Sequence, residues 1–215
     1  MRKIVLSYLL VLCNLVAVAQ TPVRVACIGN SITYGAGIEN RERDAYPVQL
    51  QRMLGEGYVV GNFGKSGATL LNKGHRPYIE QKEFQRALTF AGDVVVIHLG
   101  INDTDPRDWP NYRDYFVRDY LALIDSFRVV NPKVRILVAR MTPITNRHSR
   151  FESGTRDWHE QIQHAIERVA ELAGAQLIDF HTPLYPYPFM LPDAVHPTAE
   201  GAGILAQTVY SAITG

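Results

Sequence analysis

The sequence contains very little cysteine. Only two of its 215 residues are cysteines, Cys13 and Cys27, and Cys13 falls in an apolar segment near the amino terminus. A chain with so few cysteines has no disulfide framework and no cysteine-rich metal site. Removal of the amino-terminal segment would leave Cys27 with no cysteine partner within the chain.

An excess of charge of either sign is also absent. Lys and Arg total 22, Asp and Glu total 21, and the formal net charge is +1, with no basic block and no acidic tail. Proteins that bind nucleic acid or anionic membranes electrostatically carry clustered positive charge. The sequence therefore predicts neither partner, and we expect a small substrate that is neutral or weakly charged.

Clustered metal ligands and nucleotide-binding glycine motifs are missing as well. Apart from the one in the last loop, the histidines are scattered, and His159 and His164 are five residues apart, which does not place them on one helix face. The tripeptide at 64–66, Gly-Lys-Ser, resembles the end of a phosphate-binding loop, but Val59 stands where that motif needs glycine. We predict no metal and no cofactor.

The chain has one extended apolar run, at residues 4–18. Arg2 and Lys3 precede it, and small residues end it at 17–19. The run is shorter than the roughly 20 residues of a membrane span, and its flanks are typical of a signal peptide. We predict a signal peptide over 1–19, cleaved near Ala19 and Gln20, and export to the periplasm or the medium without a membrane anchor. An uncleaved anchor is the alternative.

Repeats, low-complexity tracts and linkers are absent from residues 20–215, which predicts a single domain. Short apolar runs alternate there with longer amphipathic stretches, a pattern typical of an α/β fold in which helices cover both faces of a parallel sheet. We therefore expect a three-layer α/β/α sandwich with five parallel strands. The expected strands are 23–28, 58–62, 93–99, 134–139 and 176–179, and the expected helices are 46–54, 84–90, 112–130, 155–173 and 198–213.

Polar residues suited to chemistry follow four of these elements. They occupy residues 29–33 (GNSIT), 62–67 (NFGKSG), 100–103 (GIND) and 193–197 (DAVHP). Ligands of open parallel sheets bind beyond the carboxyl ends of the strands. We therefore expect these four segments to converge on one rim.

A nucleophile, a base and an orienting carboxylate are all available at this rim. Ser31 directly follows a strand, next to glycine that permits a tight turn, although a serine there is also a common helix cap. Asp193 stands three residues before His196, a spacing that lets the carboxylate reach the imidazole within one loop. The Asn102 side chain and the Gly64 N–H complete the set as donors for an oxyanion, and simple turn chemistry is the alternative for both.

The four segments, in this order, resemble the motifs of the SGNH hydrolases, also called GDSL esterases and lipases, over essentially the whole chain after the signal peptide. The resemblance implies a flavodoxin-like sheet and acyl transfer. It makes Ser31 the nucleophile, His196 the base and Asp193 its orienter, with Ser31, Gly64 and Asn102 forming the oxyanion hole. The family usually has Asp before the serine, whereas this chain has Asn30; we expect the turn to survive with altered electrostatics.

Within that family, the GNSIT form on an exported chain is most similar to bacterial carbohydrate and sialate O-acetylesterases. This implies a small-molecule or glycan ester as substrate. A lipase or thioesterase of the same fold and a non-catalytic carbohydrate-binding protein are the alternatives. The candidate substrate contacts are Asn30, Asp103, Arg140, Arg147, Tyr185 and Tyr187.

Overall fold

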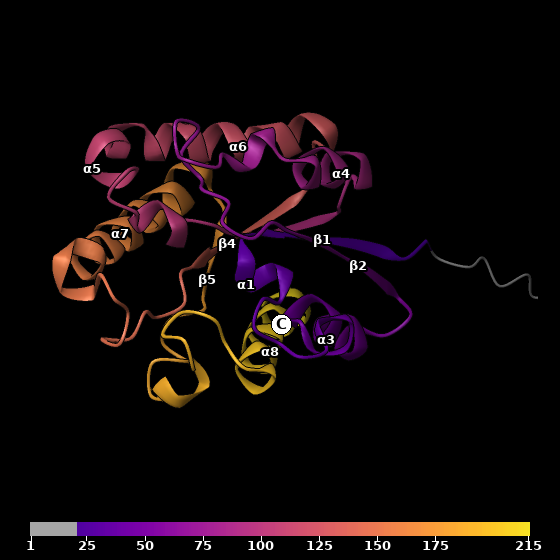
Figure 1. Ribbon diagram of the computed structural model, residues 1–215. Helices are drawn as coiled ribbons and strands as arrows, with labels where there is room; N and C mark the ends of the chain where they lie inside the picture. The colour runs from indigo at the N-terminus through magenta and orange to yellow at the C-terminus, as the bar shows by residue number, and fades with distance from the viewer. Residues whose placement is uncertain (1–20) are drawn as a thin grey trace, which may run out of the picture.

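The computed structural model describes residues 21–215, and they form a five-stranded parallel sheet between two layers of helices (Figure 1). The strand order is β2-β1-β3-β4-β5. The strands are β1 (Val23–Gly29), β2 (Tyr58–Gly64), β3 (Val94–His98), β4 (Arg135–Arg140) and β5 (Gln176–Asp179). The predicted α/β sandwich with five parallel strands is confirmed.

Helices cover both faces of the sheet. In Figure 1, α4, α6 and α7 lie on one side of the strands, and α3 and α8 lie together on the other. Their bounds are α3 (Tyr46–Leu54), α4 (Lys82–Phe90), α6 (Phe116–Val130), α7 (Arg156–Ala173) and α8 (Ala199–Thr214). These five agree closely with the ranges predicted from apolar periodicity.

The structure differs from the predicted ranges in its short helices. The helix expected over 112–130 is divided into α5 (Trp109–Tyr112), a 3₁₀ turn at Arg113–Tyr115, and α6. The division falls at Tyr112, whose φ of −131° and ψ of 6° leave the helical region. Two further short helices, α1 (Ser31–Tyr34) and α2 (Arg41–Asp44), lie between β1 and α3, where no helix was predicted.

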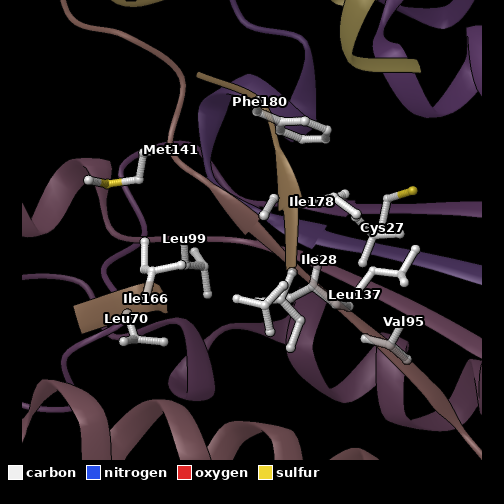
Figure 2. Close-up of a cluster of buried hydrophobic side chains, with 14 of the residues drawn as sticks. Cys27, Ile28, Leu70, Val95, Leu99, Leu137, Met141, Ile166, Ile178 and Phe180 are labelled. Atoms are coloured by element: carbon white, nitrogen blue, oxygen red, sulfur yellow. The ribbon is translucent and has the colours of Figure 1, made fainter. Parts of the chain in front are cut away.

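The buried strands explain why the apolar runs are continuous rather than alternating. Cys27 and Ile28 are consecutive in β1, so their side chains point to opposite faces, and both are fully buried. Figure 2 shows Cys27 on the side of Phe180, and Ile166 among the apolar side chains of the other side. Burial raises the pKa of the Cys27 thiol to about 12, so this free cysteine is an inert core residue.

The register of the central strands aligns their carboxyl ends. Gly29, the last residue of β1, is paired with Gly64 in β2 and with His98 in β3. The segments that follow these three strands therefore begin at the same edge of the sheet. This is the arrangement that the rim prediction requires.

The predicted signal peptide, residues 1–19, lies outside the described residues. Within 21–215, no helix combines the length and the apolar character needed to cross a bilayer.

Candidate active site

Ser31 is the first residue of α1 and lies directly beyond β1. The turn between them is tight: a Cβ on Gly29 would come within 2.9 Å of the His98 carbonyl oxygen and closer still to the Thr33 side chain, so only glycine fits. Asn30 caps α1, because its Oδ1 accepts the N–H of Ile32 at 2.9 Å. The turn and the cap together hold the Ser31 side chain at the edge of the sheet.

His196 connects Ser31 to Asp193. The Nε2 atom of His196 lies 2.8 Å from Ser31 Oγ, and its Nδ1 lies 2.6 Å from Asp193 Oδ2. The other carboxylate oxygen of Asp193 accepts the N–H groups of His196 and Val195, at 2.7 and 3.1 Å. The three residues predicted to act together therefore form one continuous hydrogen-bonded chain, with the geometry that nucleophilic catalysis by serine requires.

The environment of Asp193 keeps it ionised. Burial tends to raise the pKa of this carboxyl group, but the hydrogen bonds from His196 and Val195 outweigh it, and the pKa of Asp193 is lowered. An ionised Asp193 accepts the Nδ1 proton of His196, which leaves the Nε2 lone pair directed at the Ser31 hydroxyl.

Ser31 and His196 line a hollow with a volume of about 390 Å³. Asn102, on the 3₁₀ turn Ile101–Thr104 after β3, lines the same hollow. One hydrogen of its side-chain amide is held by the Ala68 carbonyl at 2.8 Å. The amide carries a second hydrogen, so Asn102 has a donor left for a ligand.

Gly64, whose N–H is predicted as an oxyanion donor, does not line the hollow. This N–H donates to Asn62 Oδ1 at 2.9 Å. Gly64 is the last residue of β2, and a Cβ there would lie 2.2 Å from the backbone nitrogen of Tyr34. It is glycine because α1 packs directly on this strand.

Gly67, three residues further on, lines the hollow instead. Its φ is +77°, a left-handed conformation that glycine adopts without strain. Neither the Gly67 N–H nor the Ser31 N–H takes part in a backbone hydrogen bond within residues 21–215. Among the residues that line the hollow, the N–H groups of Ser31 and Gly67 and the side chain of Asn102 therefore keep hydrogen-bond donors for a ligand.

Two predicted substrate contacts are structural residues. Asn30 is fully buried as the cap of α1. Asp103 is also fully buried, and its two oxygens accept the N–H groups of Leu70 and Leu71 at 2.9 and 2.8 Å. Burial raises the pKa of Asp103 to about 7 against the effect of these hydrogen bonds. Neither residue lines the hollow, and both side chains form hydrogen bonds within the fold.

The basic predicted contacts are engaged elsewhere. Arg140 forms ion pairs with Glu167 at 3.2 Å and Asp179 at 3.4 Å, and it does not line the hollow. Arg147 donates to the Leu191 carbonyl at 2.7 Å, which fastens its own loop to the segment before Asp193.

The aromatic predicted contacts lie beside the hollow rather than in it. Tyr185 is 69% exposed and lines a neighbouring groove that shares Ile144 with the hollow. Its ring stacks on His181, with centroids 5.4 Å apart. Tyr187 packs edge-on against Phe189 and lines neither.

Several polar residues around the hollow were not predicted. They are Ser66, His75, Asp105, His148 and Arg150. They follow strands β2, β3 and β4, so position after a strand end was the signal that could have identified them. Hydrogen bonds from Arg107 lower the pKa of Asp105 to about 2, and burial and Arg150 lower the pKa of His148. Within residues 21–215 no group of His, Cys, Asp and Glu side chains is arranged to hold a metal ion.

One relative of this chain is named as a carbohydrate esterase. The chain is 36% identical over 214 residues to an acetylxylan esterase of Xylanibacter ruminicola. The match covers 90% of this chain but only 44% of the relative, so the chain spans less than half of that protein's length.

Solved structures with the same fold include two carbohydrate esterases. The acetyl xylan esterase AlAXEase superposes with a TM-score of 0.68 at 20% identity, covering 89% of this chain and 100% of the other. Est24, a carbohydrate acetylesterase from Sinorhizobium meliloti, gives a TM-score of 0.67 at 16% identity, covering 89% and 98%. At these identities the likeness shows a shared fold.

The sequence of residues 27–204 matches the GDSL-like Lipase/Acylhydrolase family. This range includes all four polar strand-end segments, from Ser31 to His196. The chain therefore belongs to the GDSL-like lipase/acylhydrolase family.

Proposed function

We propose that this protein is a serine esterase that hydrolyses acetyl esters of carbohydrates through Ser31, His196 and Asp193. The observation that carries the proposal is the unbroken contact chain from Ser31 Oγ to His196 Nε2, at 2.8 Å, and from His196 Nδ1 to Asp193 Oδ2, at 2.6 Å. Family membership and the names of the relatives support it.

In the first half of the reaction, His196 Nε2 takes the proton of the Ser31 hydroxyl while Ser31 Oγ bonds to the ester carbonyl carbon. The negative charge that develops on the carbonyl oxygen is stabilised by the N–H groups of Ser31 and Gly67 and by the Asn102 amide. His196 then gives its proton to the leaving alcohol as the bond to that oxygen breaks. The acetyl group stays on Ser31.

In the second half, water replaces the alcohol. His196 takes a proton from the water as its oxygen attacks the acyl carbon, and the same donors hold the second oxyanion. The proton returns to Ser31 Oγ, and acetate leaves. Asp193 keeps one ring orientation and one tautomer of His196 through both halves and stabilises the imidazolium.

Asn30 is compatible with this chemistry. The cap of α1 needs only an acceptor oxygen, which Asn supplies as Asp would. Because the side chain is fully buried, a neutral amide also avoids an unpaired buried charge next to Ser31. The departure from the usual family residue therefore affects electrostatics and leaves the turn in place.

The lining of the hollow favours a short acyl group on a polar alcohol. Its apolar wall consists of single side chains such as Ile101, Ile144 and Val195, while Ser66, Asp105 and Arg150 are polar or charged. A long acyl chain gains free energy only where a continuous apolar surface covers it, at about 0.8 kcal/mol for each buried methylene. We infer that acetyl is preferred over longer chains.

Hydrolysis of p-nitrophenyl esters from acetate to octanoate tests the acyl preference. We expect kcat/KM to be highest for acetate and to fall with chain length, because polar and charged side chains interrupt the apolar lining of the hollow around Ser31. A rise from acetate to octanoate would instead indicate a lipase or thioesterase.

Covalent labelling with a fluorophosphonate probe tests the chemistry. We expect the wild type to label and Ser31→Ala to lose the label, because the probe reacts with an activated serine. A non-catalytic carbohydrate-binding protein would label in neither form.

A panel of O-acetylated glycans tests which sugar supplies the alcohol part of the ester. Partially acetylated xylan and O-acetylated sialic acids are its two main arms, with released acetate measured. We expect acetate from the xylan arm, in line with the names of the relatives.

Export through cleavage of residues 1–19 remains part of the proposal. The amino-terminal sequence of the secreted protein tests it, and we expect that sequence to begin at Gln20.

A further inference from the structure

His75 lines the same hollow as Ser31 but is not part of the chain that joins Ser31, His196 and Asp193. It lies between β2 and the 3₁₀ turn Tyr78–Glu80, and 24% of its side chain is exposed. Nothing in the proposed hydrolysis uses it. Its role has to be sought in what holds the ring and in what the ring faces.

Asp108 holds the ring of His75. The Asp108 side chain is 1% exposed; its Oδ1 accepts the His75 backbone N–H at 2.9 Å, and its Oδ2 lies 2.6 Å from His75 Nδ1. An ionised carboxylate only accepts hydrogen bonds, so Nδ1 carries the proton. In the neutral ring, Nε2 is then an acceptor with a fixed direction.

The free edge of this ring has no nucleophile to activate. Ser31 Oγ is already bonded to His196 Nε2, and one base is enough for both halves of the reaction. A fixed imidazole acceptor suits a different task, which is to accept a hydrogen bond from a hydroxyl group. An acetyl group has no hydroxyl, whereas the sugar that carries it does.

The hollow has room for the sugar. Its volume of about 390 Å³ lies in the range of small-molecule sites and exceeds what an acetyl group fills. Two further charged side chains line it, Asp105 and Arg150, which pair with each other at 3.2 Å. The hollow is therefore lined by groups that can accept hydrogen bonds from hydroxyls and groups that can donate to them.

We propose that His75 is a specificity-determining residue that accepts a hydrogen bond from a free hydroxyl of the acetylated sugar, with Asp108 as the positioning residue that fixes its tautomer. This rests on the proposed function and adds to it how the alcohol part of the ester is chosen. The enzyme then prefers partially acetylated sugars over esters of alcohols without hydroxyl groups.

The test compares two substrates in three variants. The quantity is kcat/KM for partially acetylated xylo-oligosaccharides divided by kcat/KM for p-nitrophenyl acetate, which has no hydroxyl. We expect this ratio to fall about tenfold in His75→Ala, because one hydrogen bond to a preorganised partner is lost. We expect a similar fall in Asp108→Asn, because the amide donates to Nδ1 and moves the proton to Nε2.

His164→Ala is the matched control. His164 also faces a carboxylate, Glu167 at 3.4 Å, but it is exposed on α7 and does not line the hollow. Its ratio should equal that of the wild type. If His75→Ala lowers only the melting temperature and leaves the ratio unchanged, the pair is a structural clip and the proposal is overturned.

A spectroscopic measurement covers variants that fail to fold. Ser31→Ala protein labelled with ¹⁵N-histidine is titrated with the same oligosaccharides, which it does not turn over. We expect the His75 Nε2 resonance to shift while Nδ1 stays constant. Saturable binding that leaves Nε2 unmoved would contradict the proposal. A wild type that hydrolyses neither substrate would instead remove the proposed function, and this inference with it.

Discussion

Two Asp–His pairs face one hollow, and they differ in surroundings rather than in geometry. Each has a contact of 2.6 Å between Nδ1 and a carboxylate oxygen, and in each the second oxygen accepts the histidine's own backbone N–H. Asp193, however, is 55% exposed and Asp108 is 1% exposed. Nε2 meets Ser31 Oγ only in the pair with His196.

The two pairs therefore differ in function because of the group that lies opposite Nε2. The carboxylate orients the imidazole in the same way in both. In the proposed mechanism, the imidazole beside the Ser31 hydroxyl acts as a base. In the further proposal, the imidazole that faces the rest of the hollow accepts a hydrogen bond from a sugar hydroxyl. The carboxylate supplies orientation in both cases, and burial decides how far solvent can replace that orientation when the carboxylate is removed.

Replacing the base should have the largest effect. We expect His196→Ala to lower kcat on p-nitrophenyl acetate by about 10⁴-fold or more, because no other group takes the Ser31 proton. Steady-state kinetics with purified protein measures it. Survival of most of the activity would show that His196 is not the base, and the proposed difference in function between the two pairs would be wrong.

Replacing the orienter should cost less. We expect Asp193→Ala to lower kcat by about 10³-fold, since orienting a base contributes less than being one, and Asp193 is exposed enough for water to replace part of its role. The same assay compares the two variants directly. A loss equal to that of His196→Ala would show that orientation and proton transfer are inseparable here.

A substitution of Gly64, at the end of β2, tests whether this glycine is needed for packing or as an oxyanion donor. We expect Gly64→Ala to lower the free energy of unfolding by about 2–3 kcal/mol, because the added Cβ would lie 2.2 Å from the Tyr34 nitrogen. Urea denaturation measures the change. Unchanged stability with lost activity would restore Gly64 as an oxyanion donor in place of Gly67.

His159 provides a buried histidine without a carboxylate partner. Burial lowers its pKa to about 4, and its Nε2 lies 2.9 Å from the Thr142 carbonyl oxygen. Because the folded-state pKa lies below the unfolded value of about 6.5, the stability contributed by neutral His159 is lost as pH falls from about 6.5 towards 4, at about 1.4 kcal/mol per pH unit.

His159→Gln tests this contribution. The amide retains a donor for Thr142 and does not titrate, so we expect a flatter dependence of unfolding free energy on pH in that window. Denaturation curves at several pH values measure the slopes. Equal slopes for wild type and variant would exclude His159 as a source of acid sensitivity.

The fold was largely predictable because strand and helix periodicities are local properties of the sequence. The five strands and five long helices follow from them. The division of the 112–130 helix at Tyr112 was not predictable, because the apolar spacing continues across the break. The conformation of one residue there outweighs the pattern.

The candidate site was predictable where its parts are close in sequence. Asp193 and His196 are three residues apart, and Ser31 follows a recognisable strand and turn. His75 and Asp108 are 33 residues apart, and only the folded sheet brings them together. Gly64 ends strand β2 and Gly67 lies three residues beyond it, and the choice between them depends on the hydrogen bond from Gly64 to Asn62.

Trapping the acyl-enzyme tests the central claim most directly. The protein is mixed with p-nitrophenyl acetate, quenched in acid during turnover, digested and analysed by mass spectrometry. The account predicts one acetyl group on the peptide that contains Ser31, located on Ser31 itself and absent in Ser31→Ala. Acetyl on a different residue, or undiminished turnover by Ser31→Ala, would contradict it.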